Sequence, residues 1–447
     1  MPRGISPMSR EEDEMLRALG LRSVDELFAD IPARVRVPGL PLPKGLPEQE
    51  VVIRVKDILE QNRVGGALPT YLGAGLYDHF VPASVRSIAS RSEFYTSYTP
   101  YQPEMSQGIL QALFEYQSMI CELAGMDGAN TSMYDGSTAL GEAALMAARV
   151  TGKREIVLPR ALHWEKREVL ANYARGPRLT FKEVGFDRGT GKLDLAALKA
   201  AVSDDTAAVY LEVPNFFGVL DDQVDEIRRL THGLLIVGVN PISLAVVRAP
   251  GDYGADIVVG EGQPLGNAVA FGGPLLGVFA CREEYIRKMP GRVIGATRDA
   301  DGRRAFCMTM QTREQHIRRE KAMSNICTNE TLLAVASAAY IAVLGGNGLR
   351  RVAETCIERA RTLAARIARV PGFEAPAFRA DHFNEFVVRS AKPYEAIHGA
   401  LLEAGVHGGL ALEPRFPELG HAALFATTEV HRQADDDRLI ASLEAAA

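Results

Sequence analysis

Aromatic and polar side chains are concentrated in the segment FYTSYTPYQPEMSQG, residues 94–108. Tyr95, Tyr98 and Tyr101 stand among prolines, hydroxyl and amide side chains, and Glu104 follows them. Tyrosine combines a phenol donor with an apolar ring, so a rigid polar loop of this kind could line a pocket for a small polar ligand. A loop that only covers a protein interface has a similar composition. Because glutamate and glutamines are interleaved with the rings, we favour the ligand site.

A second segment places small polar residues before a strongly helical run. In TSMYDGSTALGEAALMAAR, residues 131–149, Gly136, Ser137 and Thr138 stand at the expected start of the helix. Free amides at a helix N-terminus attract anions such as phosphate, which makes these residues weak candidates for cofactor binding. Every helix also needs a cap, so a structural role fits the pattern equally well.

A third segment, SNICTN, lies just ahead of the next helical pattern. It could present hydroxyl, amide and thiol groups to a ligand. The candidate residues are Ser324, Asn325, Cys327 and Asn329. Cys327 is either a thiol activated by the helix dipole or a buried cysteine, and we favour the buried cysteine.

The glycine-rich segment VVGEGQPLGNAVAFGGPLLG, residues 258–277, joins two predicted strands. In enzymes that use pyridoxal phosphate, a loop in this place usually carries the lysine that binds the cofactor covalently. No lysine occurs between Lys199 and Lys288. The dinucleotide motif GxGxxG, the phosphate loop GxxxxGK[ST] and the zinc motif HExxH are absent, and the histidines do not fall at metal-ligand spacing. We therefore expect no metal site.

The elements that position these segments follow from the hydrophobic pattern. Between about residues 105 and 280, short runs of β-branched residues alternate with helical patterns, which predicts a mostly parallel sheet flanked by helices in a large α/β domain over residues 66–335. The predicted strands are EIVLP from 155, AAVYLEV from 207, LLIVGV from 234, DIVVG from 256 and LLGVFA from 275.

Two smaller regions flank this domain. Residues 1–65 form a helical arm that includes an extended link, VPGLPLPKGLP, from Val37 to Pro47, suited to lie across a surface or a neighbouring subunit. A helix is expected to begin at Asn329 and stop at Gly345 and Gly346, and residues 336–447 form a smaller α+β domain.

The overall composition excludes several classes of protein. The 447 residues include 50 basic and 56 acidic side chains, a net charge of -6, which favours neither nucleic acid nor a membrane surface as a partner. We expect no apolar run near the ~20 residues that a membrane-spanning helix needs. The start lacks a secretion signal, so we expect a cytoplasmic protein. The five cysteines form no CxxC pair, and we expect free thiols that are mostly buried.

Taken together, these segments resemble the P-protein family of the glycine cleavage system, and in particular subunit 1 of its split form, glycine dehydrogenase (decarboxylating). The resemblance extends over roughly residues 5–350 and more weakly to the end. It rests on the strings ELFADIPARVR, LGAGLYDHFVPA, SRSEFYTSYTPYQPEMSQGILQALFEYQ, SMYDGSTA, PNFFG, GEGQPLG, MPGRVIGATRD and QTREQHIRREKAMSNICTN.

The resemblance implies the fold of the type I pyridoxal-phosphate transferases, with the N-terminal arm and the smaller C-terminal domain. It also implies an aminomethyl-transferring glycine dehydrogenase in an α2β2 heterotetramer with subunit 2, which carries the cofactor lysine. Glycine is the substrate, and the lipoyl arm of H-protein accepts the aminomethyl group. The present chain is then expected to hold no covalent cofactor and no catalytic residue of its own.

Three residues agree with a degenerate cofactor site. Gln263 and Asn267 occupy the loop in which a lysine is expected, and the strand LLIVGVN ends in Asn240, where many relatives have the aspartate that pairs with the pyridine nitrogen. The tyrosine-rich loop and the SNICTN junction are then expected to complete the site of the partner. Two alternatives stay open: a self-sufficient pyridoxal-phosphate enzyme such as an aminotransferase, and a non-catalytic scaffold or regulatory subunit.

Overall fold

The computed structural model describes residues 9–37, 39–62, 68–323 and 325–447. Contacts within the chain group it into two units, Met1–Ala67 and Leu68–Ala447. The predicted arm, residues 1–65, ends two residues before this division and stays a prediction. The predicted boundary at residues 335/336 lies inside a long helix and stays a prediction.

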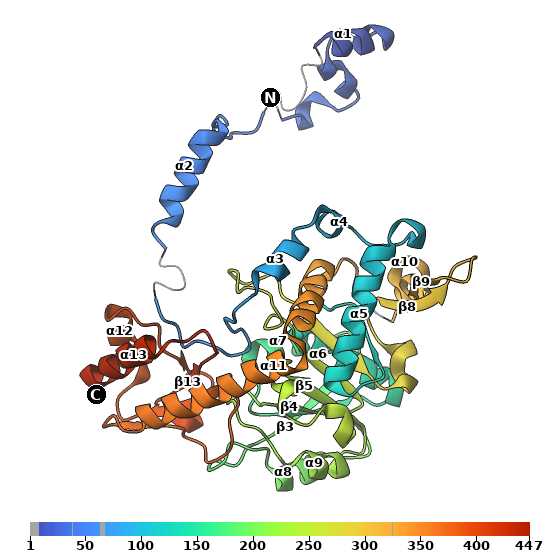
Figure 1. The fold of residues 1–447 in the computed structure, drawn as a ribbon. Coiled ribbons are helices and arrows are strands. Elements are labelled where there is room, and N and C mark those ends of the chain that lie inside the picture. Colours follow the sequence, from blue (N-terminus) through green and yellow to red (C-terminus); the bar gives the residue numbers. More distant parts are fainter. Residues whose placement is uncertain (1–8, 38, 63–67, 324) are drawn as a thin grey trace. The chain divides into compact units, whose positions relative to one another are not determined.

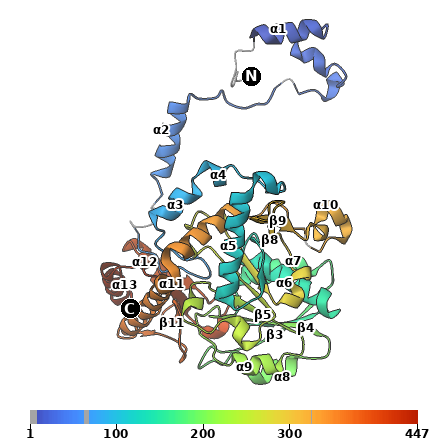
Figure 2. The same ribbon diagram turned by 45° about the vertical axis from the view of Figure 1, so that its right-hand side comes forward.

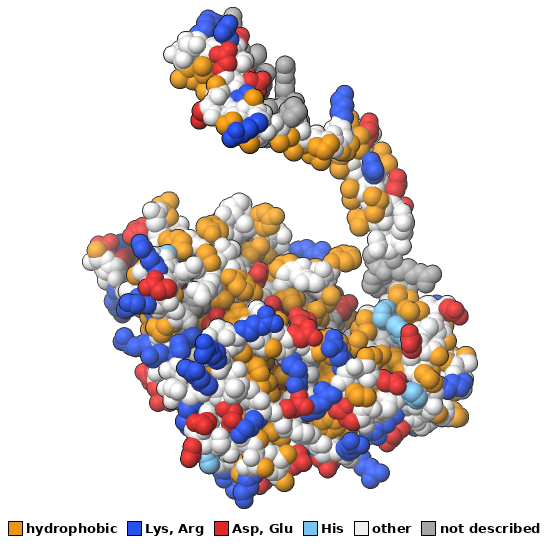
Figure 3. All heavy atoms as spheres, turned by 180° about the vertical axis from the view of Figure 1, so that it is seen from behind, with side chains coloured by type: hydrophobic (Ala, Val, Ile, Leu, Met, Phe, Trp, Pro, Cys, Tyr) orange, Lys and Arg blue, Asp and Glu red, His pale blue; other side chains and the backbone are white. Residues whose placement is uncertain are grey.

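The first unit contains short helices and an extended link. Helices α1 (Ser9–Ala18) and α2 (Glu48–Leu59) are separated by the 3-10 turns η1 (Val24–Phe28) and η2 (Ala33–Val35). Of the predicted link, the described residues 37 and 39–47 form neither helix nor strand, as expected from their prolines. Figure 3 shows hydrophobic side chains exposed along this unit. In helix α2 they lie at Val51, Val52, Ile53, Val55, Ile58 and Leu59, each more than two-fifths exposed.

A seven-stranded sheet forms the centre of the second unit (Figure 1). Its strands are β1 (Gly128–Ala129), β2 (Glu155–Pro159), β3 (Thr180–Val184), β4 (Thr206–Val213), β5 (Leu234–Val239), β6 (Ile257–Glu261) and β7 (Gly277–Cys281). The spatial order is β1-β7-β6-β5-β4-β2-β3, with parallel pairing from β3 through β6 and antiparallel pairing of β7 with β6 and β1. All five predicted strands are confirmed. Strand β3 was not predicted. It lies at the edge of the sheet, and its sequence TFKEV is mostly polar and lacks the apolar run of a buried strand.

Alternate residues of the central strands pack into two separate cores. In β5, Ile236 belongs to the core with helices α6 (Gly136–Thr151) and α7 (Trp164–Ala174), whereas Leu235 and Val237 belong to the core with α5 (Gln107–Ala124) and α9 (Val224–Leu230). A period of two in fully buried strands is the pattern of a sheet covered on both faces. Helix α8 (Leu195–Ala201) adds to the second layer through Leu198.

Helix α11 (Thr331–Ile367) connects the large sheet to the C-terminal sheet (Figures 1 and 2). Its backbone breaks at Gly345, where φ is 60° and ψ is 179°, and the helix resumes at once. The prediction that the helix is interrupted at Gly345 is therefore confirmed, but the prediction that it ends there is wrong.

By length and composition α11 could cross a membrane, which corrects the expectation that the chain has no apolar run of this length. It packs into the core through Ala334, Ala338 and Leu349, and a core helix of a soluble fold passes the same test.

The C-terminal sheet has the order β10-β11-β13-β12 and is antiparallel. Its strands and helices are β10 (Phe373–Glu374), β11 (Glu385–Ser390), β12 (Leu410–Ala411), β13 (Ala422–Ala426), α12 (Tyr394–Glu403) and α13 (Gln433–Ala446). Helices α12 and α13 cover one face, and on the other face Val387 and Leu424 pack with Phe216 and Phe217 of the large sheet's loops. This contact places β11 beside the ends of the central strands.

Further short elements surround the end of the sheet at which α6 begins. They are α3 (Ala83–Ala89), α4 (Ser92–Tyr95), the hairpin β8 (Val293–Arg298) with β9 (Arg304–Thr309), and α10 (Gln315–Arg318).

The five cysteines are free, but only Cys281 and Cys356 are buried, so the expectation of mostly buried thiols is wrong.

Candidate functional site

A small cavity of about 50 Å³ lies where the parallel strands end. The carboxyl ends of such strands are where α/β folds bind ligands. The polar groups around the cavity come from helix α7, the ends of strands β4, β5 and β6, and strand β11. They include His163, Lys166, Glu212, Asn240, Glu261 and Glu385.

Lys166 forms an ion pair with a buried carboxylate in this cavity. Its Nζ lies 2.5 Å from Oε1 of Glu212, whose side chain is 5% exposed, and the Tyr210 hydroxyl donates to the same oxygen at 2.7 Å. Burial beside Glu212 raises the pKa of Tyr210 well above its usual value, so the phenol stays protonated and remains a donor. The lysine in the cavity is therefore held by an internal partner.

A second carboxylate, Glu385 at the start of β11, is held by the segment that precedes α3. The Tyr77 hydroxyl donates to its Oε2 at 2.7 Å, and the backbone N–H of Ala74 donates to its Oε1 at 2.6 Å. Burial raises the pKa of Glu385 to about 7 in spite of these bonds. These contacts tie the C-terminal sheet to the cavity wall.

The N-terminus of helix α6 is also occupied from within the chain. The Gly136 N–H donates to Oε2 of Glu261 at 3.0 Å, and the N–H groups of Gln263 and Leu276 donate to its Oε1 at 2.9 and 3.0 Å. Asp135 caps the helix by accepting from the Thr138 N–H at 2.7 Å. Burial raises the pKa of Glu261 to about 7. The two carboxyl groups take the place that an anion would need at this terminus.

The two amides at the strand ends make different contacts. Asn240 accepts from the Ile242 N–H at 3.0 Å, but its Nδ2 is buried and has no hydrogen-bond partner among the described residues. Gln263 is fully bonded: it accepts from the Tyr77 N–H at 3.0 Å and donates to the carbonyl oxygens of Tyr77 and Asn267 at 2.9 and 2.6 Å. The glutamine thus fixes the glycine-rich loop against the segment before α3.

The tyrosine-rich segment contacts the SNICTN junction and the hairpin. Tyr98 Oη and Thr328 Oγ1 share a hydrogen bond of 3.0 Å. Arg292 donates to Tyr101 Oη at 3.2 Å with its guanidinium 5.6 Å from the ring centroid, and the His316 ring lies at 5.8 Å. Tyr95 and Tyr98 are about 70% exposed. Phe94 and Tyr95 belong to helix α4 and Gln107 begins α5, so the polar loop is shorter than predicted.

The junction in turn contacts the residues that lead into α6. The Cys327 N–H donates to Tyr134 Oη at 3.1 Å, and Asn329 Nδ2 donates to Thr131 Oγ1 at 3.2 Å. The three segments singled out in the sequence therefore adjoin one another. Tyr95, Tyr98, Tyr101, Asn325 and Cys327 are all exposed on these segments, and we call this region the exposed polar face. The preferred interpretation of Cys327 as buried is wrong, because its side chain lies on this face.

Comparison with known proteins identifies the family. The model of the glycine cleavage system P-protein matches residues 2–443. A protein of Thermococcus onnurineus named "Probable glycine dehydrogenase (decarboxylating) subunit 1" is 50% identical over 442 residues, which cover 98% of each chain. A protein of the same name from Desulfitobacterium hafniense is 46% identical, with 97% of each chain covered. The chain belongs to the glycine cleavage system P-protein family.

The solved structures agree with this assignment. The crystal structure of a P-protein glycine decarboxylase in inhibitor-bound form superimposes with a TM-score of 0.92 at 41% identity, covering 99% of this chain and all of the other. Glutamate decarboxylase of Lactobacillus brevis shares the fold, with a TM-score of 0.68 at 13% identity over 94% of this chain and 97% of the other. The predicted type I pyridoxal-phosphate fold and the P-protein resemblance are both confirmed.

Members of the P-protein family use pyridoxal phosphate, but the cavity of this chain does not fit that cofactor. A phosphate at the α6 N-terminus would displace Glu261, and the pyridine nitrogen would meet the amide of Asn240 instead of a carboxylate. Lys166 projects from α7 and is paired with Glu212, and the glycine-rich loop carries Gln263 in place of a lysine. The charges and hydrogen bonds of these groups therefore do not suit a cofactor phosphate and pyridine ring at this place.

Several predicted site residues are now located. Gly136 and Thr138 give their N–H groups to Glu261 and Asp135, so the contacts of these amides are structural in this chain. Glu104 is exposed in the turn η3 (Pro103–Met105). Ser324 lies outside the described residues. The ligand roles of all these residues stay predictions.

Sequence reasoning missed the polar groups of the cavity itself. Lys166 and Glu212 lie 46 positions apart, and Glu385 is far from both in the sequence. The sequence did point to Glu261, because a carboxylate at the end of a fully buried strand needs hydrogen-bond donors or a cation as partners. The pattern alone could not show that these partners are the first amide of α6 and the turn that follows β6.

Proposed function

We propose that this chain is the subunit of glycine decarboxylase that completes the active site of a homologous subunit 2, which holds pyridoxal phosphate on its own lysine. Together they would decarboxylate glycine and transfer the aminomethyl group to the lipoyl arm of H-protein. The family assignment supports the reaction. The division of labour is supported by one observation above all, the Glu261 carboxylate on the α6 N-terminus of this chain.

Electrostatics supports the assignment of the cofactor to the partner. A phosphate group carries close to two negative charges at neutral pH and needs free N–H donors or cations. In this chain the Gly136 amide already donates to Glu261, Asp135 adds a second carboxyl group, and the cation Lys166 is neutralised by Glu212. A subunit without a carboxylate at this terminus would bind the phosphate far better.

The exposed polar face is our candidate for this chain's contribution. The site-completing residues that we propose from the sequence are Tyr95, Tyr98, Tyr101, Glu104, Ser324, Asn325, Cys327 and Asn329, of which Ser324 lies outside the described residues. A reacting carbanion must be shielded from the protons of bulk water while a long lipoyl arm reaches it. Phenol rings can exclude water and still donate hydrogen bonds to glycine or to the arm. The bond between Tyr98 and Thr328 would hold the face in one shape on docking.

The N-terminal arm is our candidate for a contact within the assembled enzyme. The exposed apolar residues of α2 are suited to lie against a protein surface, and subunit 2 is the partner we propose for them in an α2β2 tetramer. We place the assembly in the cytoplasm, without nucleic acid or membrane as a partner.

The decisive experiment combines cofactor trapping with turnover. The purified chain is incubated with pyridoxal phosphate, reduced with borohydride and mapped for modified lysine, with Lys166 as the residue to inspect. We expect no stoichiometric adduct, and no exchange of the glycine carboxyl with bicarbonate until subunit 2 and lipoylated H-protein are added. A site-specific adduct on Lys166, with activity of the isolated chain, would instead support the self-sufficient enzyme.

A second experiment distinguishes a subunit that completes the active site from a non-catalytic scaffold subunit. Tyr98→Ala and Tyr95→Ala are made in the reconstituted tetramer, and assembly is followed beside turnover. We expect loss of turnover with assembly intact. Variants that alter assembly and leave the turnover per tetramer unchanged would support the scaffold alternative.

A further inference from the structure

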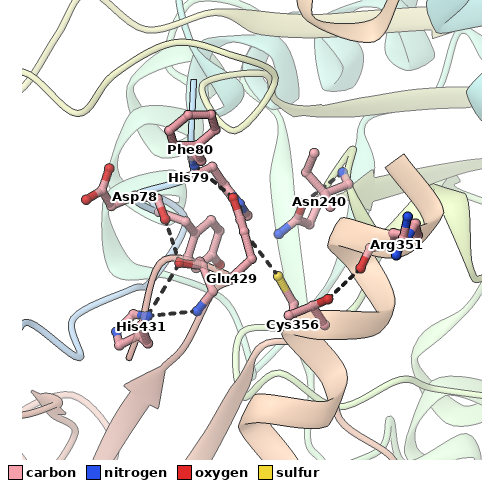
Figure 4. Close-up of polar contacts among 12 residues, drawn as sticks. Asp78, His79, Phe80, Asn240, Arg351, Cys356, Glu429 and His431 are labelled. Atoms are coloured by element: carbon pink, nitrogen blue, oxygen red, sulfur yellow. Dashed lines mark hydrogen bonds and ion pairs between the residues drawn. The ribbon is translucent and has the colours of Figure 1, made fainter. Parts of the chain in front are cut away.

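Three side chains that commonly bind metals meet in the interior of the second unit (Figure 4). His79 precedes helix α3, Cys356 lies on the second half of α11, and Glu429 follows strand β13. The ligand atoms of the three residues all lie within 4.8 Å of one another. Segments up to 350 residues apart in the sequence thus bring an imidazole, a thiol and a carboxyl group to one point.

Hydrogen bonds fix the carboxyl group at the centre of the cluster. Oε2 of Glu429 lies 2.7 Å from Nδ1 of His79 and 3.8 Å from Sγ of Cys356, and its Oε1 accepts from the Phe80 N–H at 2.8 Å. The turn that carries Glu429 is held by the hydroxyl of Thr428, which donates to the carbonyl oxygen of Asp78 at 2.6 Å. The ligand atoms are therefore positioned by backbone contacts and not by flexible side chains alone.

The cluster is buried and its hydrogen bonding is incomplete. The side chain of His79 is 2% exposed, that of Glu429 is 17% exposed, and Cys356 is fully buried. Nε2 of His79 has no hydrogen-bond partner within the described ranges, and an imidazole nitrogen can offer its lone pair to a cation. Nδ2 of Asn240, which points toward Glu429 and Cys356 in Figure 4, also has no partner there, but as a donor it needs an acceptor such as a water bound at the site. Buried polar atoms without partners are uncommon in proteins and call for a bound water or ion.

We propose that His79, Cys356 and Glu429 form a binding site for a divalent cation of the zinc class. An imidazole nitrogen, a thiolate and a carboxylate are the donors that Zn²⁺ and Co²⁺ accept, whereas Mg²⁺ and Ca²⁺ select oxygen alone. The thiolate and the carboxylate together carry two negative charges, which equal the charge of the cation. A buried site of zero net charge avoids the cost of an isolated ion in the interior.

The number of donors and their origin define the expected behaviour. Three protein ligands leave one tetrahedral position for water. Because the ligands come from the segment before α3, from α11 and from the turn after β13, a bound cation would link the C-terminal sheet to the large sheet. Binding to the folded chain alone stabilises it by mass action, so the melting temperature should rise with the cation concentration.

Cobalt provides a direct test on the full-length chain. The chain is stripped with a chelator under reducing conditions and titrated with Co²⁺. We expect one cation per chain, with the thiolate-to-cobalt charge-transfer band and the visible bands of tetrahedral cobalt, both abolished by one equivalent of Zn²⁺. Mutation of a residue that is hydrogen-bonded to a metal ligand typically lowers metal affinity by about 10- to 100-fold. Loss of the ligand itself should lower it further, so Cys356→Ser should weaken cobalt binding by more than about 100-fold.

Matched variants make the result specific to this cluster. Cys281→Ser alters a cysteine that is equally buried but lies outside the cluster, and it should keep the full cobalt spectrum. Glu429→Gln keeps the size of the side chain and should lose the tight site. Cys356→Ala also removes the thiol and should lose the cobalt charge-transfer band. It replaces Cys356→Ser if the serine variant folds poorly.

A wild-type titration that shows no stoichiometric cobalt uptake is decisive even if a variant unfolds. Stoichiometric cobalt with a thiolate charge-transfer band that is lost in a folded Cys356 variant supports the site. A wild-type chain that takes up no stoichiometric cobalt, or a band that persists in Cys356→Ala or Cys356→Ser, would overturn it. None of these readouts depends on turnover, so the result is independent of the proposed function.

Discussion

Removal of the Glu261 carboxyl group should destabilise the chain by an amount that depends on pH. In Glu261→Ala, the N–H groups of Gly136, Gln263 and Leu276 lose their acceptor. At about 1 kcal/mol for each buried donor, the free energy of unfolding should fall by about 3 kcal/mol near pH 5. At that pH the carboxyl group is largely protonated in the folded chain, because burial raises its pKa to about 7.

The sign of the pH dependence follows from the raised pKa. A carboxyl group whose folded-state pKa lies above the unfolded value contributes its full stability below about pH 4.5 and loses it as the pH rises through 7. The rise from 4.5 to about 7 corresponds to about 3 kcal/mol. The wild-type advantage over Glu261→Ala should therefore shrink from about 3 kcal/mol at pH 5 toward zero at pH 8.

Urea unfolding followed by circular dichroism at pH 5, 6, 7 and 8 measures this difference. Glu444→Ala, on the exposed surface of α13, is the matched control and should change stability little at any pH. Glu385, whose pKa is also raised, is present in both proteins, so its contribution cancels. A difference below about 1 kcal/mol at pH 5 would refute the role of the three hydrogen bonds. A difference that stays constant from pH 5 to pH 8 would refute the assigned cost of burying the charge.

Three further changes have expected outcomes. Gly345→Ala should lower the free energy of unfolding by about 1–3 kcal/mol in urea, because φ of 60° with ψ of 179° suits glycine alone, whereas Gly346→Ala should be nearly neutral. Tyr98→Phe removes the bond to Thr328 but keeps the ring, so the reconstituted enzyme should lose less turnover than with Tyr98→Ala; equal losses would contradict a packing role for the ring. A chain that begins at residue 68 should keep its melting temperature but bind subunit 2 more weakly in a pull-down, and unchanged binding would argue against an arm interface.

Local patterns were sufficient to predict most of the fold. Strands β2, β4, β5, β6 and β7 are apolar runs bounded by polar or glycine residues, and such runs are buried whatever surrounds them. The edge strand β3 has mostly exposed side chains and leaves no such pattern. Gly345 was recognised as a helix breaker, but whether a helix resumes after a break depends on the core that receives its second half.

The site was only partly predictable for the same reason. Composition singled out the tyrosine-rich loop and the SNICTN junction, and the contact of Tyr98 with Thr328 joins them. The pairing of Lys166 with Glu212 and the capping of α6 by Glu261 arise only when distant segments fold together. His79, Cys356 and Glu429 follow no metal-ligand spacing, because each lies on a different element.

The self-paired cavity has a consequence for the abundance of the protein. A subunit whose fold depends on a bound coenzyme gains stability as the concentration of that molecule rises and is degraded more readily when the concentration falls. In this chain Glu261, Glu212 and Glu385 already have partners in the polypeptide itself. Under the proposed division of labour, the steady-state level of this chain should be insensitive to vitamin B6 starvation, whereas the level of the subunit that holds the coenzyme should fall.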